Sequence, residues 1–426
     1  MISSTLSVNN QIIHRTVLPN GLVIVAVENS AADIIAARIF IRAGSCYEQR
    51  SQAGQFGLLS ALLTKGTPRL SSLEIAEQVE SVGAHLGADT STDYSLMSLK
   101  TVSADFPALF SLAAELLRSP SFPQSEVELE QRLTVQSLRS MQEQPFTVAY
   151  NQLRQVMYRD HPYALPGLGT EESVLALDRE MLHQTHQTYF RPDNMVVSIT
   201  GRIAPEQAVA LVEQFLGDWR PPTKPLPPLI FPLLSPNPCR MVIPQETNQS
   251  IVMVGYLAAA VKQPAYPALK LLITHLGNGL SSRLFVELRE KRGLAYDVSA
   301  FYPTRLGVSQ FVAYMGTAPE NTAIALASLQ HEVERLCAKS LTAEELQVAK
   351  NKLLGQYALG KQTNAQIAQL LGWYEILGLG VEFDQRFQAE LAAVTVEETQ
   401  AFACKFFTDP FVSIVGPAQA VDPLMN

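Results

Sequence analysis

Two histidines with the spacing of metal ligands stand near the middle of the chain. His183 and His186 lie at i and i+3 of a predicted helix, and Glu180 lies one turn before His183. Side chains at this spacing share a helix face and could hold a metal ion. The simpler interpretation is an exposed helix face, because neither a second group of ligands nor a general base accompanies the pair.

Arg292 and Tyr296 are the best candidates for stabilising charge during a reaction. They bracket the turn that follows a predicted helix over residues 282–291. A guanidinium fork and a phenolic hydroxyl both suit a substrate carbonyl or a tetrahedral oxyanion. The alternative is structural: Arg292 would form an ion pair with Glu287 or Glu290, and Tyr296 would pack on a sheet.

A glycine-rich segment just before this helix could bind the backbone of a peptide substrate. It contains Gly277, Gly279 and Ser281. Glycines allow a close approach, and free amides at a helix N-terminus can hold a carbonyl oxygen. Phosphate binding is the weaker alternative, because the flanking pattern of a dinucleotide-binding fold is missing.

Charge and composition exclude several classes of function. The 426 residues include 32 Lys and Arg against 40 Asp and Glu, a net charge of −8, without a basic run, so we expect no nucleic-acid partner. No apolar stretch reaches the ~18–20 residues of a membrane span. The four scattered cysteines predict reduced thiols, and no secretory signal is recognisable, so we expect a cytoplasmic protein. Neither a G-x-S-x-G elbow nor a phosphate-binding loop occurs.

The elements that must position these residues fall into two similar halves. A proline-rich stretch over residues 219–238 can form neither a helix nor a central strand, and it predicts an extended linker. Each half contains strands, helices and a capping box before a long helix, Ser125 with Glu128 and Thr342 with Glu345. An internal duplication explains this pattern, and chance similarity of two ordinary α+β domains is the alternative.

The expected fold is therefore α+β, with two duplicated domains that each contain a mostly antiparallel sheet covered by helices. The predicted boundaries are 1–220 for the N-terminal domain, 221–238 for the linker and 239–426 for the C-terminal domain.

Eight short stretches, taken in order, resemble the pitrilysin-type zinc peptidases, in the branch near the mitochondrial processing peptidase. The stretches are 18–22 (LPNGL), 42–45 (RAGS), 65–67 (KGT), 161–163 (HPY) with 168–170 (LGT), 189–195 (YFRPDNM), 281–285 (SSRLF) and 288–296 (LREKRGLAY). The resemblance implies two α+β domains that form a clam-like chamber for peptides together with a partner.

The zinc site of this family is missing from the sequence. The inverted motif H-x-x-E-H places two zinc-binding histidines on one helix face and the general base between them. Alignment on residues 65–67 puts the three positions at Gly57, Ser60 and Ala61, and the family's third ligand, a glutamate, at Ser137. Because none of these residues can bind zinc as imidazole or carboxylate does, we expect no cofactor in this chain.

The resemblance thus implies a non-catalytic subunit of a two-chain zinc metallopeptidase. Arg292 and Tyr296 would act in trans on a peptide or unfolded protein, and the zinc would lie in a homologous partner subunit. A homodimer in the absence of that partner is left open. The alternative is a structural subunit without a role in proteolysis.

Overall fold

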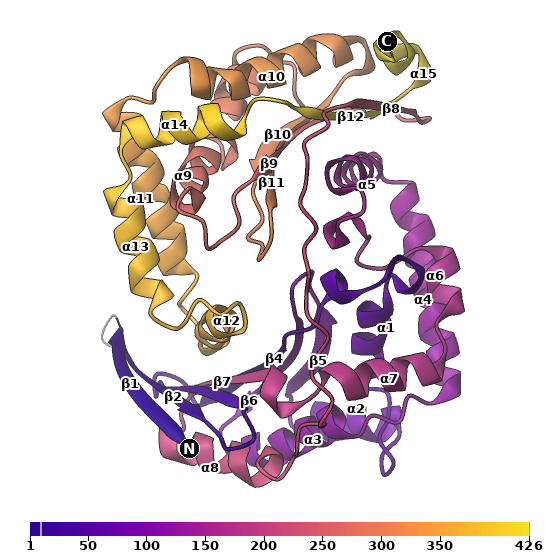
Figure 1. The fold of residues 1–426 in the computed structure, drawn as a ribbon, viewed down its shortest axis with the longest axis vertical. Coiled ribbons are helices and arrows are strands. Elements are labelled where there is room, and N and C mark those ends of the chain that lie inside the picture. The colour runs from indigo at the N-terminus through magenta and orange to yellow at the C-terminus, as the bar shows by residue number, and fades with distance from the viewer. Residues whose placement is uncertain (9–10, 426) are drawn as a thin grey trace. The chain divides into compact units, whose positions relative to one another are not determined.

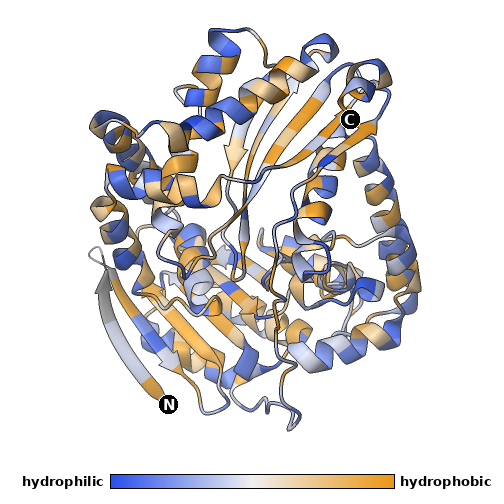
Figure 2. Ribbon diagram, turned by 45° about the horizontal axis from the view of Figure 1, so that its top comes forward, coloured by the Kyte–Doolittle hydropathy of each residue, from blue (hydrophilic) through white to orange (hydrophobic). Residues whose placement is uncertain are grey.

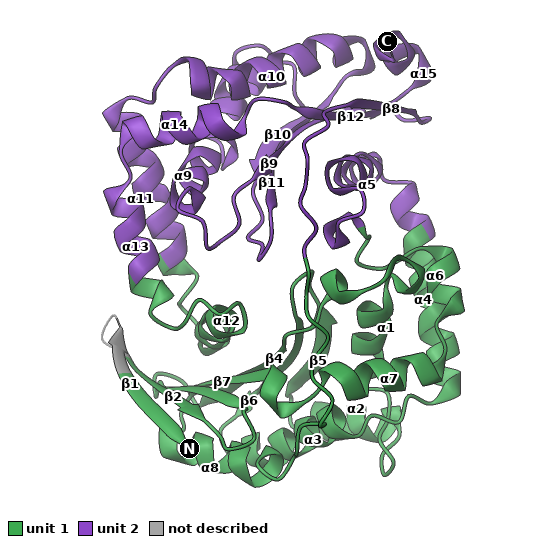
Figure 3. Cartoon of the chain, in the orientation of Figure 1, with its two compact units in different colours: residues 1–138, 165–230, 358–385 green, residues 139–164, 231–357, 386–426 purple. Residues whose placement is uncertain are grey.

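The computed structural model describes residues 1–8 and 11–425 (Figure 1). It divides the chain into two compact units (Figure 3). Unit 1 contains residues 1–138, 165–230 and 358–385, and unit 2 contains residues 139–164, 231–357 and 386–426. Each unit has one sheet with helices packed on it, so the predicted α+β class with two domains is confirmed.

Unit 1 is built on a seven-stranded sheet with the order β1-β2-β3-β7-β4-β6-β5. Among the described pairs β3–β7 is parallel and the others are antiparallel. The strands are β1 (Ile2–Val8), β2 (Gln11–Val17), β3 (Val23–Glu28), β4 (Ile34–Ile41), β5 (His85–Thr90), β6 (Ser95–Val102) and β7 (Met195–Gly201).

Unit 2 is built on a five-stranded sheet with the order β10-β11-β9-β12-β8. Its strands are β8 (Arg240–Pro244), β9 (Ser250–Ala258), β10 (Asp297–Phe301), β11 (Ser309–Thr317) and β12 (Phe411–Gly416). Figure 2 shows that the strands of both sheets are largely hydrophobic, whereas most helices have a hydrophobic and a hydrophilic side.

The two sheets share one topology once the β1–β2 pair is set aside. In chain order, β3 to β7 correspond to β8 to β12. The first strand of each set pairs in parallel with the fifth, and the second, fourth and third follow in antiparallel pairs. The same unusual order in both sheets favours an internal duplication over chance similarity.

Helices belong to both units, and three of them cross a boundary between the units. Those of unit 1 are α1 (Gln55–Leu62), α2 (Ser72–Glu80), α3 (Phe106–Arg118), α6 (Glu171–Ala176), α7 (Arg179–Tyr189), α8 (Pro205–Leu216) and α12 (Asn364–Ile376). Those of unit 2 are α5 (Pro145–Tyr158), α9 (Tyr266–Gly277), α10 (Thr322–Ala338), α14 (Val396–Phe406) and α15 (Ala418–Val421). Helices α4 (Gln124–Gln142), α11 (Ala343–Leu359) and α13 (Phe383–Ala393) cross a boundary between the units. Across the described residues, no helix is both long and apolar enough to span a bilayer.

One predicted capping box is confirmed and the other is wrong. The Thr342 hydroxyl accepts from the Glu345 amide at 3.1 Å, and the Glu345 carboxylate accepts from the Thr342 amide at 2.8 Å. Ser125, by contrast, lies inside α4, which starts at Gln124. The helix begins earlier because the carbonyl of Pro123 already accepts from the amide four residues later, that of Val127, at 3.0 Å.

Each sheet has a helix on it that comes from the opposite half of the chain. Helix α12 packs on β4 and β7, and α5 packs on β9 and β12. The fit is close at glycines: a Cβ added to Gly372 would lie 2.3 Å from the Phe40 ring, and one added to Gly255 would lie 2.9 Å from the sulfur of Met157. Helices α5 and α12 occupy equivalent places in the two repeats. Each repeat therefore contributes the equivalent helix to the sheet of the other, and we call this arrangement a reciprocal helix exchange. The compact units therefore differ from the contiguous domains 1–220 and 239–426, since a helical pattern does not reveal which sheet the helix will cover.

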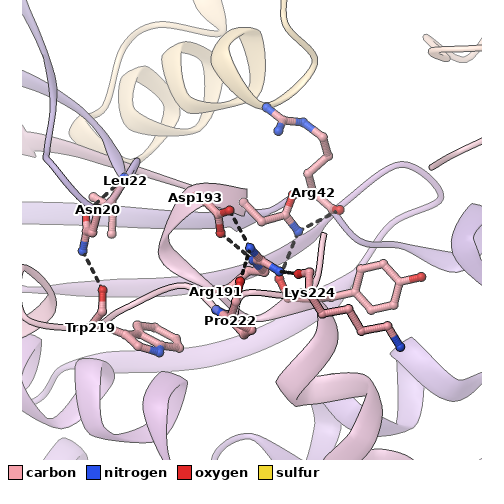
Figure 4. Close-up of polar contacts among 10 residues, drawn as sticks. Asn20, Leu22, Arg42, Arg191, Asp193, Trp219, Pro222 and Lys224 are labelled. Atoms are coloured by element: carbon pink, nitrogen blue, oxygen red, sulfur yellow. Dashed lines mark hydrogen bonds and ion pairs between the residues drawn. The ribbon is translucent and has the colours of Figure 1, made fainter. Parts of the chain in front are cut away.

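The predicted linker lacks helix and strand from residue 219 to residue 239, and two motif residues of unit 1 hold its beginning (Figure 4). The Asn20 side-chain amide donates to the carbonyl of Trp219 at 3.1 Å. Arg191 donates to the carbonyls of Pro222 at 3.0 Å and Lys224 at 2.7 Å. These bonds give the LPNGL and YFRPDNM stretches a structural role.

The cysteine prediction is wrong for two of the four residues. Cys337, in the last turn of α10, forms a disulfide with Cys404 of α14. Cys46 and Cys239 are not part of a disulfide. The pair is separated by 67 residues, and sequence spacing alone does not reveal that the two helices lie side by side.

Candidate functional site

The positions that align with the zinc motif lie on α1, where Ser60, at the position of the general base, belongs to a network of hydroxyl groups. Ser60 is buried, and its hydroxyl lies 2.6 Å from that of Thr90. The Thr90 hydroxyl lies 2.9 Å from the carbonyl of Phe56 and 2.9 Å from the hydroxyl of Ser95. Ser95 donates to the carbonyl of Ala43 at 2.7 Å. These neutral hydroxyl and carbonyl groups are hydrogen-bond partners of one another, so they form a polar cluster that is complete without a metal ion.

The remaining aligned positions are equally unsuited to zinc. Gly57 faces the 167–168 segment, and a Cβ there would lie 3.3 Å from the carbonyl oxygen of Gly167. Ala61 has no ligating atom. Ser137 is exposed on α4 and donates back to the carbonyl of Leu133 at 3.0 Å. No group of three or more His, Cys, Asp or Glu side chains in the described chain is arranged to hold a metal ion.

A buried carboxylate that sequence reasoning missed holds the start of α1. Glu48 is 7% exposed, and its two oxygens accept from the backbone amides of Gly54 and Phe56, each at 2.8 Å. Burial raises the pKa of Glu48 to about 8, although the two amide bonds favour the charged form. Glu48 therefore positions the helix that carries Gly57, Ser60 and Ala61.

Arg292 lies on the surface of unit 2, partly fixed by α10. Its guanidinium donates to the Ser328 hydroxyl at 3.1 Å and lies 3.7 Å from a Glu332 carboxylate oxygen, while 42% of the side chain stays exposed. The structural alternative, in which Arg292 forms an ion pair with Glu287 or Glu290, is wrong about the partner. The Glu287 carboxylate instead accepts from Lys291, and an exposed side of Arg292 remains available to a ligand.

Tyr296 presents a free hydroxyl just before β10. The residue is 60% exposed, and within the described chain its hydroxyl has no hydrogen-bond partner. Only its backbone is fixed, by an amide that donates to the carbonyl of Gly316 at 2.8 Å. The alternative in which Tyr296 packs on the sheet is therefore wrong.

The predicted helix over residues 282–291 is a short helical turn at Arg283 and Leu284 followed by a π-helix over Phe285–Glu290. π-Helical segments are rare and occur frequently at functional sites. The wide helix leads directly into the turn that carries Arg292.

Glu332 of α10 is the second site residue that sequence reasoning missed. It is 1% exposed and lies 3.3 Å from Arg283, 3.4 Å from Arg335 and 3.7 Å from Arg292. Its place in the apolar stripe of α10, one turn from Leu329 and Leu336, is a sign of burial, but Arg283 and Arg292 are remote from it in sequence.

Glu332→Ala is expected to lower the free energy of unfolding by about 3 kcal/mol, because Arg283, 10% exposed, would lose the carboxylate of its ion pair. Chemical denaturation followed by circular dichroism measures the change. Glu334→Ala, at an exposed position of the same helix, is the matched control and should cost less than about 0.5 kcal/mol. Equal losses in the two variants would contradict the role assigned to Glu332.

The glycine-rich segment is only partly open to a ligand. A Cβ on Gly277 would lie 2.3 Å from the amide nitrogen of Ala300, so this glycine permits α9 to pack against β10. Gly279 has φ +79° and is exposed, as is Ser281. Binding of a peptide backbone therefore stays a prediction for Gly279 and Ser281, whereas Gly277 has a packing role.

The two histidines of α7 pack against aromatic rings. The Nε2 atom of His186 lies 2.9 Å from the carbonyl oxygen of Leu117, and its ring stacks on Phe190 with centroids 4.9 Å apart. Burial lowers the pKa of His186 to about 4. The ring of His183 contacts Phe122. The exposed helix face expected here is wrong for His186, and this packing does not favour metal binding.

Comparison with known proteins reveals relatives along nearly the whole chain. An uncharacterized zinc protease of Mycobacterium leprae is 26% identical over 95% of this chain and 91% of its own length. The uncharacterized zinc protease YmxG of Bacillus subtilis is 25% identical over 95% of this chain and 98% of its own length.

Solved structures share the fold. A peptidase M16 inactive domain from Pseudomonas fluorescens matches with a TM-score of 0.89 at 24% identity, covering 95% of this chain and 98% of that one. A protease from Helicobacter pylori matches with a TM-score of 0.89 at 22% identity, covering 95% and 99%. Residues 23–171 match the family described as Insulinase (Peptidase family M16), and residues 176–353 match the Peptidase M16 inactive domain. The chain therefore belongs to peptidase family M16.

Proposed function

We propose that this chain is the non-catalytic subunit of a heteromeric zinc metallopeptidase, in the branch near the mitochondrial processing peptidase. The observation that carries the proposal is a contrast between the two units. Ser60 lies in a closed hydroxyl network where the family motif has its general base, while Arg292 and Tyr296 keep exposed polar groups. A chain that lacks its own metal site can use such groups only on a reaction for which another chain supplies zinc and base.

The proposed chemistry of this chain is the binding of charge that develops on a substrate peptide. The Arg292 guanidinium would bind the carbonyl oxygen as it becomes an oxyanion, and the Tyr296 hydroxyl would donate to the same atom or its neighbour. Ser328 and Glu332 hold one side of the guanidinium, so its orientation is set before substrate binds. Gly279 and Ser281, which precede Arg292 in the sequence by about ten residues, would bind the backbone of the substrate peptide.

A structural subunit is the second candidate function. The ion pair with Glu332 favours it, because this contact gives Arg292 a role in stability without any substrate. A homodimer in the absence of the partner is compatible with either function. We also propose a cytoplasmic location. The Cys337–Cys404 disulfide is an argument against this location, because stable disulfides are rare in reducing compartments.

Affinity purification of the native chain, followed by metal analysis, tests the proposal. The chain alone should contain no stoichiometric zinc and cleave no peptide, and the chain that co-purifies with it should contain an intact H-x-x-E-H motif and zinc. One tightly bound zinc per copy of this chain would contradict the non-catalytic role. Partners that all lack the motif would favour the structural subunit.

A further inference from the structure

We propose that unit 1 contains a binding site for a small multivalent oxyanion at the beginning of the linker. A cavity of 590 Å³ lies between the end of α3, the last turns of α7 and residues 219–225. It is lined by Arg118, Arg191, Arg220 and Lys224, and the described residues that line it include no Asp or Glu. This linker-root cavity is unrelated to the proposed peptidase role.

The charges of the linker-root cavity do not cancel. Arg118 donates to Asp218 at 2.6 and 3.2 Å, and Arg191 donates to Asp193 at 2.6 and 2.8 Å. Within the described chain, the side chains of Arg220 and Lys224 form no hydrogen bond or salt bridge, although the charge of Arg220 also acts on Asp218. Two cations whose side chains have no hydrogen-bonded carboxylate in the described chain thus border one cavity of a chain whose net charge is −8. They provide the electrostatic attraction that an anion with two or more charges requires.

The backbone that carries Arg220 and Lys224 is held in place. Figure 4 shows the Arg191 fork bonded to the carbonyls of Pro222 and Lys224, and Asn20 bonded to the carbonyl of Trp219. Prolines at 221, 222 and 225 restrict the same backbone. Because this backbone is held before binding, an anion meets little entropic cost of ordering the main chain.

The ligand class follows from the donors. Two separate cations and the side-chain amide of Gln187 match several oxygens on one molecule, as in a polyphosphate or a polycarboxylate. Trp219 forms part of the wall, and the Arg118 guanidinium lies 5.8 Å from its ring centre. The volume suits a small molecule.

Fluorescence of Trp219 provides a direct test in the full-length chain. The chain has two tryptophans, so Trp373→Phe leaves Trp219 as the single reporter. This variant is titrated with sodium tripolyphosphate and, separately, with citrate, both at constant ionic strength, with chloride as the reference. We expect a saturable change with at least one of the two anions, and the comparison distinguishes phosphate from carboxylate ligands.

The cation variants decide the outcome. Arg220→Gln with Lys224→Gln should raise the dissociation constant at least about tenfold, because two charge-assisted contacts are lost. The matched control, Lys100→Gln with Arg132→Gln, removes the same charge at two exposed positions outside the cavity and should leave the constant unchanged. Absence of a saturable response to both anions, or equal losses in the two double variants, would overturn the proposal. Circular dichroism verifies that each variant is folded.

Discussion

Arg292→Ala is expected to lower the kcat of the complex, assembled with its native zinc-bearing partner, by about 10²–10³-fold. The guanidinium is proposed to bind charge that appears only in the transition state, so the loss should fall on kcat more than on KM. Loss of one oxyanion donor typically has this magnitude, or roughly 3–4 kcal/mol. Steady-state kinetics on a fluorogenic peptide measures the change, and size-exclusion chromatography verifies assembly.

Three variants separate catalysis from structure in this experiment. Arg292→Lys keeps the charge but loses the planar fork, and should recover only part of the activity. Tyr296→Phe removes a hydroxyl without a partner in the described chain, so any loss of kcat reports on the substrate. Arg289→Ala, at an exposed position of the same motif, should have little effect. Normal turnover by both Arg292→Ala and Tyr296→Phe would leave the structural subunit as the function.

Glu48→Gln is expected to change how the stability of unit 1 depends on pH. The folded-state pKa of Glu48 is raised from 4.5 to about 8 by burial, so the folded protein binds this proton more tightly than the unfolded chain does. Its contribution to stability is complete below pH 4.5 and disappears as the pH rises to about 8. Relative to Glu48→Gln, the wild-type free energy of unfolding should fall by up to ~5 kcal/mol across this window.

Denaturant unfolding at a series of pH values measures this difference. Glu77→Gln, at an exposed position on α2, is the control and should follow the wild-type profile. A constant difference between wild type and Glu48→Gln from acid to alkaline pH would show that Glu48 does not titrate in this window.

Local signals in the sequence predicted much of the fold. The linker follows from proline chemistry, and the Thr342–Glu345 capping box follows from the preference of hydroxyl and carboxylate side chains for free amides. The absence of an H-x-x-E-H sequence is also a local property, because the residues of that motif are neighbours in sequence. These features depend on neighbours within a few residues.

The features that were missed depend on residues far apart in sequence. Glu48 is buried because α1 folds over it, and Glu332 has its role because Arg283 and Arg292 approach it from the preceding part of unit 2. The disulfide required two helices to be adjacent. No periodic pattern contains such information, since pairing at a distance is decided by the packing of the whole unit.

Helices α5 and α12 each pack on the sheet from the opposite half of the chain, and this arrangement affects how the protein folds during its synthesis on the ribosome. Asn364 of α12 donates to the carbonyl of Ile34 across 330 residues, so β4 emerges long before the helix that covers it. Until nearly the whole polypeptide has been translated, Phe40 and its neighbours on that face of the sheet have no cover from α12. The nascent chain thus presents an apolar surface that molecular chaperones bind, and a fragment that ends before α12 would keep this surface permanently.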